Sequence, residues 1–92
     1  MKHTHTQDDY THDHKAFILS PNEWPSWPVC PLKRTRTSMA VYEVQAGILL
    51  PYGTTVYLVN MFDRAALNSL HDQPCIEYAD VDALLADGWQ VD

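Results

Sequence analysis

The clearest alternation of apolar and polar residues covers residues 39–50 and predicts a β-strand. One face of this strand would be apolar, and the opposite face would be partly polar. The apolar face would carry Ala40, Tyr42, Val44 and Ala46. Gly47 interrupts the pattern, and we expect a bulge or a bend there.

Residues 54–62 are apolar on both faces, which is typical of a buried central strand. Between the two strands, residues 50–53 contain a proline and a glycine at positions that suit a turn. We therefore expect the two segments to pair as a β-hairpin, with Leu58 buried in its central strand.

The next segment predicts a short helix followed by a short strand. Asp63 suits the N-cap of a helix over residues 64–71, and Phe62 is placed to pack on Leu67. The strand would cover residues 75–78. Twelve residues separate Phe62 from Cys75, which is near the minimum for a parallel crossover, so this strand could run parallel to the second strand of the hairpin and antiparallel to the first.

A second helix is predicted to begin after its N-cap, Asp80, and to end before Gly88. Gly88 suits the left-handed backbone conformation that often follows the last residue of a helix, and Trp89 is placed to pack back on Leu84. The predicted fold is therefore α+β, with an antiparallel or mixed sheet of three to four strands and two short helices.

Residues 24–31 have prolines and tryptophans at every third position. Three residues per turn is the repeat of polyproline II, whose φ proline already adopts. One ridge of such a segment would carry Trp24, Trp27 and Cys30. We expect an extended strap that precedes the sheet and packs across it. The alternative is a ligand for SH3-type grooves, because residues 28–33 match the pattern P-x-x-P-x-K.

Residues 1–15 contain one aromatic residue, and no aliphatic residue follows Met1. Such a segment buries too little apolar surface to offset its ordering entropy, so we expect a flexible tail rich in His and Asp. Residues 16–19 form a short apolar run that suits a first edge strand. The predicted organisation is a tail over residues 1–15 and one globular domain over residues 16–92.

The composition suits one small domain, because the chain has 92 residues and 46% of them are hydrophobic. The sequence has no apolar run of membrane-spanning length, and its N-terminus lacks the apolar region of an export signal. We therefore expect a cytoplasmic protein, or one in a host cytosol if it is phage-encoded. In that compartment Cys30 and Cys75 are expected to be reduced and buried.

The net charge of −6 is unevenly distributed. From residue 38 onward eight acidic residues accompany a single base, Arg64, which disfavours bulk binding of nucleic acid. Half of the six bases lie together at Lys33, Arg34 and Arg36. This cluster suits a protein partner or limited contact with a phosphate or nucleic-acid backbone. The alternative is a solvated connection between strap and hairpin.

The tail holds four of the five histidines as two H-x-H pairs. In an extended chain, residues two positions apart lie on one side, so each pair suits a Zn, Cu or Ni ion. These candidate ligands are His3, His5, His12 and His14. The alternative is a solvated leader whose histidines bind nothing specific, and no cofactor is expected in the globular domain.

The sequence contains no nucleophile elbow, phosphate-binding loop or HExxH zinc motif. We therefore expect a non-enzymatic protein-binding module that occupies a partner's surface, such as a phage-type inhibitor of a host nucleic-acid-handling defence complex. The expected partner-binding residues are Trp24, Trp27, Lys33, Arg34 and Arg36. The alternative function is metal binding by the tail.

Overall fold

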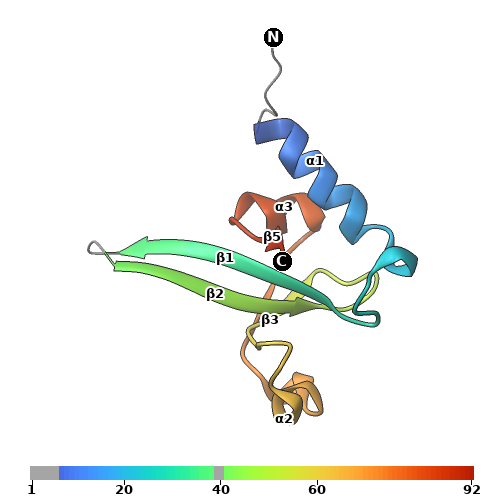
Figure 1. Ribbon diagram of the computed structural model, residues 1–92, viewed down its shortest axis with the longest axis vertical. Coiled ribbons are helices and arrows are strands. Elements are labelled where there is room, and N and C mark those ends of the chain that lie inside the picture. The colour runs from blue at the N-terminus through green and yellow to red at the C-terminus, as the bar shows by residue number, and fades with distance from the viewer. Residues whose placement is uncertain (1–6, 39–40) are drawn as a thin grey trace.

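The computed structural model describes residues 7–38 and 41–92 of the protein. They form an α+β fold around a five-stranded antiparallel sheet with the order β4-β3-β2-β1-β5 (Figure 1). The strands are β1 (Cys30–Ser38), β2 (Val41–Leu49), β3 (Thr55–Tyr57), β4 (Cys75–Glu77) and β5 (Gln90–Val91). The helices are α1 (Gln7–Ile18), α2 (Arg64–Leu67) and α3 (Val81–Ala86), with 3-10 turns η1 (Pro21–Glu23) and η2 (Leu70–Asp72).

The dominant hairpin joins β1 and β2, which pair without interruption from Cys30↔Leu49 to Ser38↔Val41. The expected hairpin between β2 and β3 is present but small, with Ile48↔Tyr57 as its paired residues. The alternative of a solvated connection through the basic residues was wrong, because those residues lie in β1. Strands at the rim of a sheet accept Lys, Arg and Thr well, so charge does not by itself indicate a loop.

Gly47 does not form a bulge, because it pairs in regular register with Leu32. A Cβ at this position would lie 2.6 Å from Val56 Cγ1 and 2.9 Å from Trp89 Cζ3. Glycine is therefore required by the close approach of two core side chains to the backbone of β2.

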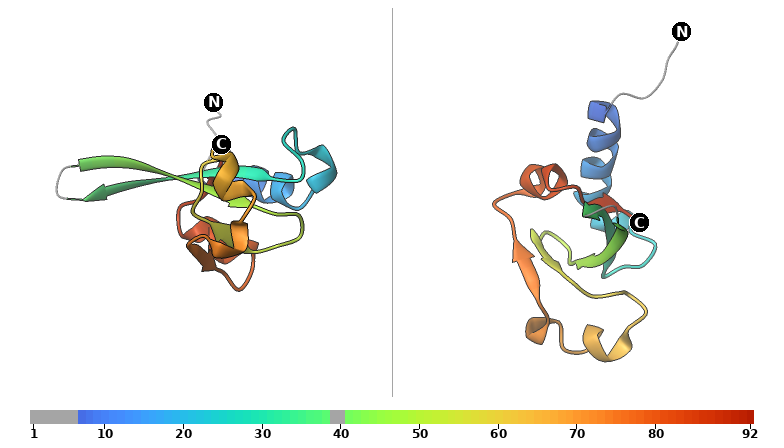
Figure 2. Two further views of the ribbon diagram at one scale, coloured as in Figure 1. Left: turned by 90° about the horizontal axis from the view of Figure 1, so that it is seen from below. Right: turned by 90° about the vertical axis from the view of Figure 1, so that its left-hand side faces the viewer.

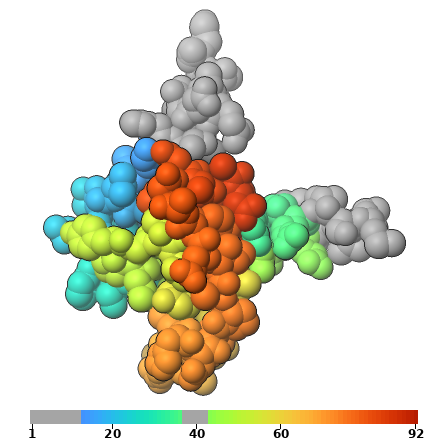
Figure 3. Space-filling view, turned by 180° about the vertical axis from the view of Figure 1, so that it is seen from behind, coloured from blue at the N-terminus to red at the C-terminus, as the bar shows by residue number. Residues whose placement is uncertain are grey.

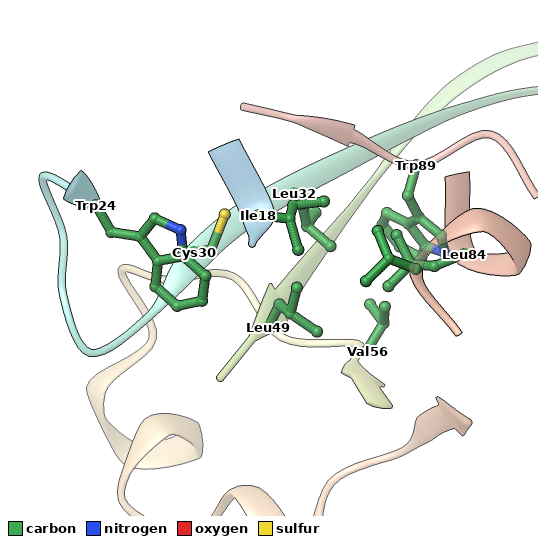
Figure 4. Close-up of a cluster of buried hydrophobic side chains, with 9 residues drawn as sticks. Ile18, Trp24, Cys30, Leu32, Leu49, Val56, Leu84 and Trp89 are labelled. Carbon is green, nitrogen blue, oxygen red and sulfur yellow. The ribbon is translucent and has the colours of Figure 1, made fainter. Parts of the chain in front are cut away.

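The main core lies between the sheet and the helices α1 and α3, as Figure 4 shows for its principal side chains. A smaller cluster, which includes Ile48, Val59 and Ala66, packs against α2. Figure 1 shows α2 on the side of the sheet away from α1 and α3. In β3 the fully buried residue is Val56, whereas Leu58 lies just beyond the strand and is partly buried. The main cluster contains Ile18, Trp24, Cys30, Leu32, Leu49, Val56, Val81, Leu84 and Trp89.

The N-terminal segment differs from the sequence prediction. Residues 7–18 form helix α1, so the expected edge strand over residues 16–19 was wrong and the expected tail does not reach residue 15. Lys15 Nζ lies 2.9 Å from Asp82 Oδ1, and Ile18 is buried in the core. These contacts with distant residues stabilise a helix that the local composition does not indicate.

The polyproline II strap was also wrong. After η1, residues 25–28 form a turn in which the Trp27 amide donates to the Trp24 carbonyl and the Trp27–Pro28 peptide bond is cis. Trp24 is buried, and its indole N–H donates to the Phe17 carbonyl at 2.9 Å. Trp27 is 61% exposed, so the two tryptophans do not share one ridge. The period of three reflects two turns that place these rings in different environments.

The predicted N-caps and the left-handed Gly88 are confirmed, whereas the helix expected over residues 64–71 ends at Leu67 and is followed by the separate 3-10 turn η2. Asp63 accepts a hydrogen bond from the Ala66 amide at 3.1 Å, and Asp80 accepts one from the Ala83 amide at 2.8 Å. Gly88 has φ +98°, and Trp89 joins the core cluster that contains Leu84.

Two details beyond these helix ends were wrong. Phe62 is 83% exposed, so it does not pack as a hydrophobic staple on α2. β4 runs antiparallel to its neighbour β3, whereas the sequence allowed a parallel arrangement.

Candidate functional site

Arg34 belongs to the interior of the protein. Its guanidinium donates to Asp87 Oδ2 at 2.7 Å and to Gln45 Oε1 at 2.6 and 3.1 Å. The same group lies 4.6 Å from the centroid of the Trp89 ring, a cation–π contact. With 7% of its surface exposed, Arg34 holds the sheet to the segment after α3 and does not present its charge to a partner.

Asp87 is the centre of a network that extends to Tyr78. The Tyr78 hydroxyl donates to Asp87 Oδ2 at 2.5 Å and accepts from the Trp89 indole N–H at 2.9 Å. Burial, and then the hydrogen bond to Asp87, raise the pKa of Tyr78 above its ordinary value of 10.0. These bonds offset the unfavourable position of Asp87 at a helix C-terminus.

The other two expected basic residues lie on opposite faces of β1. Lys33 is exposed, and its Nζ lies 3.7 Å from Asp92 Oδ1. Arg36 is also exposed and is directly opposite Glu43 in the register of the hairpin. The three bases that are close in sequence therefore do not form one basic patch, because successive residues of a strand point to opposite sides.

The expected metal ligands are only partly within the described residues. His3 and His5 lie outside them, and the description of His12 does not extend to its side chain. His14 lies in helix α1, where its Nδ1 accepts the Val91 amide at 3.1 Å. The extended backbone that the expected pairing of residues 12 and 14 requires is replaced by helix α1. Among the described residues no three His, Cys, Asp or Glu side chains are grouped to hold a metal.

Both cysteines are free, as expected, but only one is buried. Burial raises the pKa of Cys30 to about 12, which keeps it a thiol. Cys75 is exposed on β4, so the expectation that both are buried was wrong.

A groove of about 380 Å³ lies between the end of α1, the turn after β2 and the start of α3. Figure 3 shows these three segments side by side, in blue, yellow and orange-red. The groove is lined mainly by apolar side chains, including Ile18, Leu19, Tyr52 and Val81. Its polar lining includes Lys15 and Asp82, which pair with each other.

Tyr52 and Leu19 line this groove and remain largely exposed, at 83% and 55%. Tyr52 has φ +62°, a left-handed conformation that costs a non-glycine residue about 1–2 kcal/mol. Strained residues of this kind are concentrated at functional sites. The sequence alone did not predict this site, although the tyrosine between Pro51 and Gly53 is the one aromatic side chain in the expected turn.

A second groove of about 370 Å³ lies on the other side of the α1 end. Phe17, Trp24 and Phe62 line it, and Phe62 is 83% exposed. The turn after β2 and the segment around η1 lie together at the end of the sheet opposite the tip of the β1–β2 hairpin (Figures 1 and 2). This end of the molecule therefore carries the exposed side chains Leu19, Trp27 and Tyr52.

Comparison with known proteins gives no significant match: no family model matches the chain, and neither does a curated protein or a solved structure. No helix within residues 7–38 and 41–92 combines the length and apolar character needed to cross a bilayer.

Proposed function

We propose that this protein is a non-enzymatic binding module, and that the groove between α1, the turn after β2 and α3 receives a segment of a partner protein. The observation that carries the proposal is the apolar groove whose mouth holds two large exposed side chains, Leu19 and Tyr52. Aromatic anchors of this kind contribute most of the binding energy at protein interfaces.

The polar groups of the groove favour binding over catalysis. Lys15 and Asp82 form an ion pair at 2.9 Å, and Asp80 accepts the Ala83 amide as the N-cap of α3. These contacts engage the polar groups in stabilising the fold. A general acid or base needs a polar group directed at a substrate, whereas the ionic groups of this groove are held in structural contacts around an apolar wall.

The charge of the groove and of the chain selects the partner's chemistry. Asp80 and Asp82 lie at the groove against one base, Lys15, which pairs with Asp82, and the chain from residue 38 onward has a net charge of −7. The partner segment is therefore an apolar side chain flanked by Lys or Arg, because opposite potentials accelerate association and exclude wrong partners. Basic surfaces of this kind occur on proteins that handle nucleic acid, which agrees with a phage-type inhibitor of such a host complex.

A displayed library of random peptides, selected on the whole protein, tests this proposal. The selected peptides are expected to combine an apolar residue with neighbouring Lys or Arg. Leu19→Glu and Tyr52→Ala should weaken their binding at least tenfold in fluorescence polarisation, about 1.4 kcal/mol. Tyr52→Ala removes the ring but keeps a non-glycine residue at the strained position. Phe62→Ala, equally exposed but in the second groove, is the matched control and should leave affinity unchanged.

Two outcomes contradict the proposal. Selection of peptides that lack Lys and Arg would contradict the proposed charge complementarity between the groove and its partner. Peptides that bind Leu19→Glu as well as the unaltered protein would place the binding surface elsewhere.

A further inference from the structure

The β1–β2 hairpin projects beyond the body of the protein (Figures 1 and 2). β5 pairs with β1 only at Leu32 and Lys33, and β3 pairs with β2 at Ile48. We call the outer part of the hairpin, residues 34–38 and 41–46, the ribbon. Within the described residues, neither outer edge of the ribbon has a neighbouring strand.

The orientation of the backbone groups identifies which residues face outward. The Pro31 carbonyl accepts the Asp92 amide at 3.0 Å, so it points from β1 toward β5. In an antiparallel strand the N–H and C=O of one residue share a direction, and this direction alternates along the chain. Thr35 therefore directs its backbone groups away from β2. In β2 the backbone groups of Ile48 point away from β1 and toward β3. By the same rule, Val44 and Ala46 also direct their backbone N–H and C=O groups away from β1.

The two open edges differ in charge. The β1 edge of the ribbon carries the exposed Arg36, and positive charges on an edge strand oppose pairing with a second copy of that strand. The β2 edge carries Glu43, Val44, Gln45 and Ala46, among which Glu43 is the single charge. Val44 is 61% exposed on this edge, where an apolar β-branched side chain favours strand pairing.

We propose that a second copy of this chain pairs antiparallel with the β2 edge, on a two-fold axis through Val44. In this register Val44 faces Val44 of the second copy, and Glu43 faces Gln45 of the second copy. No like charges meet, and the carboxylate of Glu43 lies opposite an amide that donates hydrogen bonds. The two ribbons would form a continuous four-stranded sheet, with the basic β1 edges outermost.

The self-pairing satisfies backbone groups that the chain itself leaves to solvent. Residues 42, 44 and 46 all direct their N–H and C=O groups outward, so the dimer would gain about six backbone hydrogen bonds. A two-stranded ribbon is marginally stable alone, whereas four strands support one another. The contact involves the ribbons alone and is smaller than a standard interface, so association should require high protein concentration. It does not involve the groove proposed to bind a partner.

Sedimentation equilibrium of the whole chain, at concentrations up to about 1 mM, tests the proposal. The unaltered protein should form a dimer whose fraction rises with concentration. Val44→Lys places two positive charges on the two-fold axis, and Val44→Pro removes an outward N–H without removing a β1–β2 bond. Each should raise the dissociation constant at least tenfold. Thr35→Lys and Thr35→Pro are the matched controls, because Thr35 pairs with Val44 at the same height on the opposite edge.

A monomeric protein throughout this range would overturn the proposal. The proposal would also be overturned if the Thr35 variants lost the dimer to the same extent as the Val44 variants. It would equally be overturned if the Val44 variants retained the dimer as fully as the Thr35 variants. Circular dichroism of each variant establishes that the fold is intact.

A disulfide at the axis tests the register itself. In a Cys75→Ser background, Val44→Cys should give a covalent dimer under mild oxidation, since hydrogen-bonded partners have Cα atoms about 5.5 Å apart. Thr35→Cys in the same background should stay monomeric. Cross-linking of Thr35→Cys as fast as Val44→Cys would show random collision and reject the register.

Discussion

Arg34 and Asp87, 53 positions apart in the chain, meet at 2.7 Å between the guanidinium Nη1 and the carboxylate Oδ2. The arginine side chain is 8% exposed, whereas that of the aspartate is 50% exposed. The pair joins the base of the ribbon to the end of α3. Because one partner is largely buried, its loss leaves polar groups without their hydrogen bonds.

Arg34→Met should therefore lower the free energy of unfolding by about 2–3 kcal/mol, less than for a fully buried pair. Arg34→Lys keeps the charge but loses the planar fork and the stacking on Trp89, and should lose about half as much. Arg36→Met is the control on the same face of β1, and it should change stability by less than about 1 kcal/mol. Urea unfolding measures all three. Equal effects at positions 34 and 36 would contradict the network.

The stability of the protein should fall at alkaline pH through Tyr78. Its pKa is raised in the folded state, so the protonated hydroxyl is favoured there and its contribution is complete below about pH 10. The contribution is lost as the pH rises through the folded pKa, where the phenolate would face the Asp87 carboxylate. Urea midpoints between pH 8 and 11.5 measure this loss. Tyr78→Phe should reduce this loss of stability at alkaline pH. Tyr52→Phe, at an exposed position, should show the same loss as the unaltered protein.

Gly47→Ala should destabilise the protein by about 1–3 kcal/mol, because the added methyl overlaps Val56 and Trp89. Gly53→Ala is the control, since a Cβ there has its nearest contact at 3.5 Å, from the Leu50 carbonyl oxygen. It should change stability by no more than about 1 kcal/mol in either direction. Thermal unfolding of both variants measures these two changes in stability. If Gly47→Ala were as stable as the unaltered protein, Trp89 would have to lie farther from the backbone of β2 than in this structure.

The two cysteines should differ sharply in reactivity. Cys75 is exposed, whereas Cys30 is buried with its pKa raised to about 12. A thiol reagent at pH 8 should modify one thiol per native molecule, and none in Cys75→Ser. The second thiol should react only after unfolding in urea. Rapid modification of the native Cys75→Ser protein would contradict the burial of Cys30.

Local sequence signals predicted the parts of the fold that depend on neighbours in the chain. The caps Asp63 and Asp80 and the left-handed Gly88 each act within a few residues, and all three are confirmed. Helix α1 and β5 could not be predicted, since they depend on contacts such as Lys15–Asp82 and Val91–His14. Tertiary contacts of this kind override local propensity.

The burial of Arg34 did have a signal in the sequence. Cys30, Leu32 and Arg34 alternate with period two, which assigns the arginine to the face of β1 that carries two buried apolar residues. The charge of the segment concealed that pattern. The groove around Tyr52 had no periodic signal, because three separate segments form it and each contributes only three or four residues.

The pairing of β5 with β1 has a consequence for synthesis of the protein on the ribosome. Trp89 is almost fully buried in the core, and Asp92 donates its amide to Pro31. The β1–β2 hairpin can form early because its contacts are local, but the core that it covers stays open until residues 89–92 have left the exit tunnel. A nascent chain arrested before these residues should therefore be sensitive to proteases throughout, and protection should arise in a single step when they emerge.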